Sequence, residues 1–95
     1  MIKELAEKLL PFGPEKIILF GSQAKGKARE ESDIDLCVVI ETEKKHRLIP
    51  ELYCALDCDK PVDIIVYTPK EWEECVKDET SFAHKILTEG VVLYG

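Results

Sequence analysis

SDIDLCVVI, at residues 32–40, places two aspartates at the start of an otherwise apolar run. Short apolar runs bounded by polar residues predict buried strands. Ile34 to Ile40 (IDLCVVI) is therefore expected to be a strand, and it alternates at first and is wholly apolar at its end, which is typical of a central strand. Alternate residues of a strand point to the same face, so we expect Asp33 and Asp35 side by side, with Ile34 turned into the core.

Two runs on either side of this segment also predict strands. Lys16–Phe20 (KIILF) is apolar and rich in isoleucine, and Val62–Tyr67 (VDIIVY) is apolar except for its second residue. Val91–Tyr94 is expected to be a last short strand or an extended tail. Gly21 to Ser32 is polar and predicts a turn, with room for one short helix starting at Ser22.

Helices are expected between the strands. The first ten residues show helical spacing of apolar side chains, at Ile2, Leu5, Ala6, Leu9 and Leu10. Glu43 to Asp57 has a helical composition with Leu48, Ile49, Leu52 and Leu56 on one face, and Pro50 predicts either a kink or a fresh helix start. Thr68-Pro69 predicts the start of a helix through Val76, and Ser81 to Glu89 a last helix that Gly90 ends.

This alternation of strands and helices indicates an α/β layer with a partly parallel sheet, in one domain over residues 1–95. A chain of 95 residues leaves no room for a separate substrate-binding domain. The net charge of −6 argues against direct binding to nucleic acid, which needs a cationic surface. No apolar run approaches the roughly 20 residues that span a bilayer. The charged N-terminal segment is unlike a signal peptide, so a cytoplasmic protein without membrane contact is expected.

The four cysteines are Cys37, Cys54, Cys58 and Cys75. Cys54 and Cys58 are one helical turn apart, but no second pair of ligands at short spacing accompanies them, as a structural zinc site would require. Four reduced thiols are therefore expected.

Three groups of residues suggest a chemical site. Asp33 and Asp35 would repel each other unless a cation binds between them, and magnesium prefers carboxylate oxygen. Gly21 allows close backbone approach to a phosphate, and Ser22 and Lys25 add a hydroxyl and a positive charge in the same turn. Asp63 is a charge in an apolar strand, and it can reach Asp33 and Asp35 if that strand is their neighbour.

Each group alone has an ordinary explanation, as a solvated strand end or a capped turn. Together they match two-metal phosphoryl chemistry, in which shared carboxylates hold two ions about 3.5–4 Å apart against the attacking and leaving oxygens. Nucleotidyl transfer asks mainly for positioning and charge neutralisation of this kind.

The joint pattern resembles the DNA polymerase beta-type nucleotidyltransferase superfamily, and in particular its minimal nucleotidyltransferase (MNT) branch. The resemblance lies in FGSQAKG at 20–26, SDIDL at 32–36, VDI at 62–64 and ILTEGVVLY at 86–94. It implies an α+β palm-like domain, a mixed sheet flanked by helices. It also implies that Gly21, Ser22 and Lys25 bind the triphosphate of ATP, while Asp33 and Asp35 hold two Mg²⁺ ions. Asp63 would complete the site of the ion that activates the attacking hydroxyl.

The resemblance further implies a partner. MNT proteins are commonly antitoxins of HEPN-domain toxins, and some adenylylate a tyrosine of the toxin. One departure concerns Gln23 and Lys25, which stand where the family often has arginine and lack its bidentate fork. A non-catalytic module that masks a HEPN partner is therefore an alternative. A third is a small α/β domain whose motifs are accidental.

Overall fold

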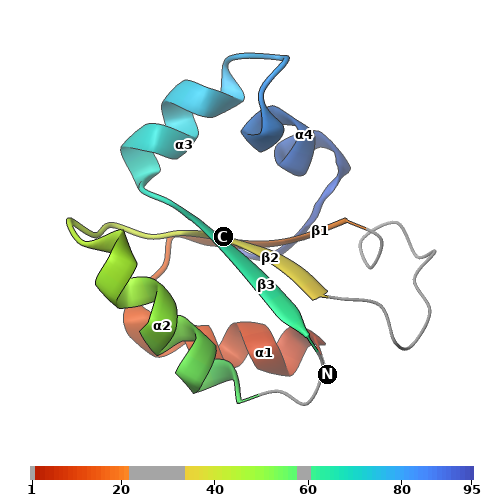
Figure 1. The fold of residues 1–95 in the computed structure, drawn as a ribbon. Helices are drawn as coiled ribbons and strands as arrows, with labels where there is room; N and C mark the ends of the chain where they lie inside the picture. The colour runs from red at the N-terminus through yellow and green to blue at the C-terminus, as the bar shows by residue number, and fades with distance from the viewer. Residues whose placement is uncertain (1, 22–33, 58–60) are drawn as a thin grey trace.

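A computed structural model describes residues 2–21, 34–57 and 61–95. In the described residues, helices lie before, between and after the strands, and a short strand comes last (Figure 1). In chain order they are α1 (Ile2–Leu9), η1 (Leu10–Phe12), β1 (Lys16–Phe20), β2 (Ile34–Val39), α2 (Lys45–Leu56), β3 (Val62–Tyr67), α3 (Pro69–Val76), α4 (Phe82–Glu89) and β4 (Val91–Tyr94).

These strands form one sheet in the order β3-β2-β1-β4. The β2–β3 pair is parallel, whereas β1 runs antiparallel to both β2 and β4. The parallel pair is joined by α2, which crosses from the end of β2 to the start of β3. The sheet is therefore mixed and flanked by helices, which confirms the fold class that the sequence predicts.

The helices cover the sheet from two sides (Figure 1). On one face α1 and α2 pack on alternate strand residues that include Ile17, Leu36 and Val38. On the other face α3 and α4 pack on the residues between them, including Ile18, Cys37 and Val39. The two central strands are thus buried on both faces, as the apolar end of SDIDLCVVI indicates.

Pro50 lies inside α2, which runs from Lys45 to Leu56 without a break. Of the two possibilities that the sequence leaves open, a fresh helix start at Pro50 is therefore wrong. The helix tolerates the loss of one backbone donor because Pro50 is on its exposed side, while Leu52 and Leu56 are buried in the core. The expectation of Leu10 on the apolar face of α1 is also wrong. The chain enters the 3₁₀ turn after Leu9, with Pro11 next, and Leu10 is exposed.

The last two helices begin as predicted. Thr68 caps α3, with its hydroxyl accepting from the Glu71 amide while the Glu71 carboxylate accepts from the Thr68 amide. Ser81 caps α4. Gly90 ends α4, but at φ −80° it does not have the left-handed conformation of a usual C-terminal glycine. Glycine fits there because a Cβ would collide with the Ile86 carbonyl and with the Ile18 side chain on β1.

The cysteines within the described ranges are free thiols: Cys37 is buried, Cys75 is half-buried and Cys54 is exposed. Burial raises the pKa of the Cys37 thiol to about 12, so it stays protonated and inert. Cys58 lies outside the described residues. In the part of the chain that the structure describes, no helix is long and apolar enough to cross a membrane.

Candidate functional site

Asp35 and Asp63 occupy paired positions on the parallel strands β2 and β3. Paired residues of neighbouring strands lie about 4.8 Å apart and point to the same face. Alternation along β2 puts Asp35 on the face of Cys37 and Val39, which α3 and α4 cover. Asp35 is half-buried and Asp63 is exposed. Two carboxylates therefore lie side by side at one edge of that face. The sequence predicts that Asp63 reaches Asp35 if their strands are neighbours, and β2 and β3 are paired.

Gly21 ends β1 directly beside Asp35. Phe20 is the register partner of Asp35, and Gly21 follows with φ +76°, a left-handed conformation that favours glycine. A Cβ at Gly21 would collide with Oδ2 of Asp35. In the described structure the close neighbour of Gly21 is thus the Asp35 carboxylate, and the approach of a phosphate to this backbone stays a prediction.

Asp33, Ser22 and Lys25 lie outside the described residues, as do Gln23 and the other residues between Gly21 and Ile34. Within residues 2–21, 34–57 and 61–95, no three acidic, histidine or cysteine side chains gather where they could hold a metal ion. The described part of the candidate site consequently supplies two carboxylates, Asp35 and Asp63, and the backbone of Gly21.

A tyrosine fixes the backbone next to Asp63. The Ile64 amide donates a hydrogen bond of 2.9 Å to the hydroxyl of Tyr53, which reaches it from α2. Because β3 is at the edge of the sheet, none of the described strands lies beyond this amide to pair with it. Tyr53 therefore satisfies an edge donor and ties α2 to the peptide that follows Asp63.

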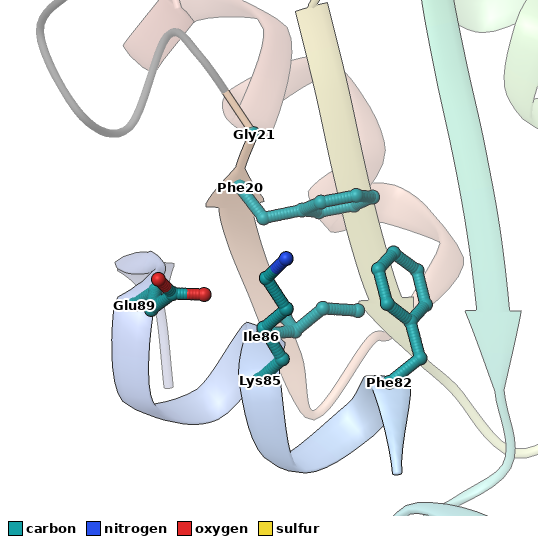
Figure 2. Close-up of a pocket in the computed structure, with 6 residues that line it drawn as sticks. All are labelled: Phe20, Gly21, Phe82, Lys85, Ile86 and Glu89. Atoms are coloured by element: carbon teal, nitrogen blue, oxygen red, sulfur yellow. The ribbon is translucent and has the colours of Figure 1, made fainter. Parts of the chain in front are cut away.

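A cavity of about 190 Å³ opens between the end of β1 and α4. Figure 2 shows Phe82 and Lys85 extending from α4 toward Phe20. The lining residues are Phe20, Gly21, Phe82, Lys85, Ile86 and Glu89. The rings of Phe20 and Phe82 meet edge to face, with centroids 5.5 Å apart and an interplanar angle of 85°. The cavity shares Gly21 with the carboxylate pair, so the two features adjoin.

Comparison with known proteins gives the class of this fold and site. The chain matches the family described as polymerase beta, nucleotidyltransferase, over residues 1–95. The chain belongs to this family of nucleotidyltransferases, and the resemblance seen in the sequence is confirmed. A protein of Methanocaldococcus jannaschii, described as a candidate protein adenylyltransferase, is 35% identical over 80 residues, which cover 84% of this chain and 78% of that protein.

Solved structures share the fold. The crystal structure of a toxin–antitoxin with AMP-PNP superposes with a TM-score of 0.60 at 23% identity, covering all of this chain and 74% of the other. A candidate nucleotidyltransferase from Sulfolobus solfataricus gives a TM-score of 0.59 at 23% identity, covering 96% of this chain and 74% of that one. At this identity the two likenesses support the mixed sheet and its flanking helices.

The sequence motifs predict no site role for Tyr53 or for the α4 residues of the cavity. Phe82, Lys85, Ile86 and Glu89 stand at positions i, i+3, i+4 and i+7, so helical spacing alone puts them on one face of α4. Helical spacing does not show which strand end this face of α4 approaches. That information comes from the antiparallel pairing of β4 with β1, which brings α4 alongside the end of β1.

Proposed function

We propose that this nucleotidyltransferase moves AMP from ATP, in a magnesium-dependent reaction, to a hydroxyl of a protein partner. The partner we propose is a HEPN-domain toxin, the acceptor is a tyrosine, and the modification makes this chain the antitoxin. The observation that carries the proposal is the pairing of Asp35 with Asp63 beside Gly21, in a chain of this family.

The donor set fits magnesium. Asp35 and Asp63 offer carboxylate oxygens from adjacent strands, and one of the two is exposed and open to a ligand. Mg²⁺ favours one or two protein carboxylates and completes its shell with water and phosphate oxygens. Asp33, Asp35 and Asp63 would hold the two ions, which supply positive charge against the phosphates when bound.

The chain's own residues would position the reaction. Gly21 lets the triphosphate approach the backbone beside Asp35, and Ser22 and Lys25 would contact its oxygens. The acceptor oxygen forms a bond to the α-phosphorus while the bond from that phosphorus to the β-phosphate oxygen breaks, and pyrophosphate leaves. Asp63, the exposed carboxylate of the pair, would accept the proton of the hydroxyl.

The partner assignment has two supports. The sequence motifs resemble the MNT branch, whose members commonly act on HEPN toxins. A toxin–antitoxin crystallised with AMP-PNP shares the fold over the whole of this chain. The relative from M. jannaschii, described as a candidate protein adenylyltransferase, points to a protein rather than a small molecule as acceptor.

The experiment is to incubate the protein and the product of its neighbouring gene with ATP and Mg²⁺, and to measure the intact mass of both. We expect one or more AMP units on the partner, mapping to a tyrosine, and none with Asp35→Asn or Asp63→Asn. An unchanged partner mass, with the complex formed, contradicts the proposal.

Masking without chemistry is the second candidate, and Gln23 and Lys25 in place of the family's arginines favour it. The two candidate functions predict different results when cells that express the toxin are tested for survival. If protection needs only contact, the Asp35→Asn, Asp63→Asn double variant protects cells as well as wild type. If protection needs transfer, the variant binds the toxin but does not protect.

A further inference from the structure

The cavity between β1 and α4 reaches Gly21, the residue next to the carboxylate of Asp35. Gly21 lies against Asp35 and also forms part of the cavity wall. A molecule whose phosphates lie at Asp35 and Gly21 can therefore extend its other end into this cavity, which is partly open to solvent. The cavity is on the α3 and α4 side of the sheet, the same side as both aspartates.

Its lining suits an uncharged aromatic group. Phe82 leaves 48% of its surface exposed beside the cavity, and its contact with the buried Phe20 holds the ring in place. The apolar side chain of Ile86 also lines the cavity. Among the described lining residues, Lys85 and Glu89 contribute one positive and one negative charge, so these residues together offer no excess of positive charge to the triphosphate. The triphosphate belongs at the magnesium site, and the apolar part of the nucleotide belongs here.

We propose that this cavity is the subsite for the nucleoside of the donor nucleotide, with the base packed against Phe82. The assignment rests on the proposed function and adds to it the residues that bind the base. Packing of a base on an aromatic side chain accepts any base, so Phe82 gives affinity for nucleosides in general. Lys85 and Glu89, the charged side chains among the described lining residues, can then help to distinguish one base from another.

The test compares ATP with inorganic tripolyphosphate, which has the phosphates and lacks the nucleoside. Isothermal titration with Mg²⁺ measures both ligands against wild type, Phe82→Ala, Phe82→Trp and Leu87→Ala. Leu87 is the matched control, because it is on the same helix, is 43% exposed and does not line the cavity. Phe82→Ala should weaken ATP binding about tenfold and leave tripolyphosphate binding unchanged. Phe82→Trp should restore ATP binding.

Photolabelling of the unmutated protein with 8-azido-ATP gives a second readout, and the label is expected on residues 82–89 or at the end of β1. If wild type binds tripolyphosphate as tightly as ATP, or if Phe82→Ala binds ATP normally, the nucleoside subsite is wrong while the phosphate site stands. If ATP binds normally to Phe82→Ala but KM for the protein acceptor rises, the cavity holds the acceptor side chain instead, which also overturns the proposal. If neither ligand binds with Mg²⁺, the proposed function itself fails.

Discussion

The carboxylate of Asp35 occupies the space that a side chain at Gly21 would need. Gly21→Ala should therefore displace Asp35, in addition to the backbone cost of about 1–2 kcal/mol for a non-glycine residue in the left-handed region. We expect nucleotidyl transfer to fall on the order of 100-fold, since a displacement of about 1 Å near the reacting atoms has effects of that size.

Gly13→Ala is the control for this prediction. Gly13 has φ +77°, nearly the same as Gly21, but nothing lies within 4 Å of its Cβ position. The Gly13→Ala variant should lose a similar amount of unfolding free energy to backbone strain and keep its nucleotidyl-transfer activity. Equal activity of the two variants would show that the contact between Gly21 and Asp35 has no functional role.

A second prediction concerns the two paired carboxylates. Asp63→Asn removes a like charge opposite Asp35, which should leave the metal-free protein at least as stable as wild type. Because an ion bound only to the folded state raises the melting temperature, Mg²⁺ should stabilise wild type and have little effect on the variant. Transfer activity should fall on the order of 100-fold. Glu51→Gln is the control, because it removes one charge from an exposed position on α2. Mg²⁺ should still raise the melting temperature of this variant.

Sequence patterns predicted the strands well because each strand has a simple local signature. The bounds of KIILF and VDIIVY are those of β1 and β3, and Thr68-Pro69 marks the start of α3. The sequence predicts the pairing of Asp35 with Asp63 only if their strands are neighbours in the sheet, because strand order is set by packing between distant segments. The cavity was not predicted for the same reason: it depends on where β4 pairs.

Local rules also failed where tertiary contact decides. Gly90 is at the predicted end of α4, but the Ile86 carbonyl and the close approach of Ile18 on β1, and not a left-handed turn, require the glycine. Pro50 can lie within α2 because burial of Leu52 and Leu56 against the sheet outweighs one missing hydrogen bond. Neither reason is visible in the residues next to these positions.

The hydrogen bond from the Ile64 amide to Tyr53 gives a third prediction. Tyr53→Phe keeps the ring and removes the acceptor, which should cost about 1 kcal/mol of unfolding free energy. Amide exchange at Ile64, followed by NMR, should speed up relative to the rest of β3. Tyr94→Phe is the comparison, since Tyr94 is 44% exposed against 40% for Tyr53 and is on the opposite edge strand. Unchanged exchange at Ile64 in Tyr53→Phe would contradict the role of this hydroxyl.

A fourth prediction follows from Glu71, whose carboxylate bonds to Lys45 and to the Thr68 amide. These contacts, the one with Lys45 first, lower the pKa of Glu71 below its ordinary value of 4.5. A carboxyl whose pKa is lower in the folded state stabilises the fold above its unfolded pKa and loses that effect as pH falls through the folded value. The contribution of Glu71 should therefore be complete at pH 7 and decline below about 4.5.

Urea unfolding, followed through the fluorescence of the buried Trp72, measures this contribution. At pH 7 Glu71→Gln should be less stable than wild type by under about 1 kcal/mol, because the pair with Lys45 is half-exposed. The difference between the two proteins should shrink as the pH is lowered toward 3. Glu73→Gln removes an exposed charge from the same helix and should show no such convergence. A difference that stays constant with pH would mean that the charge of Glu71 does not stabilise the start of α3.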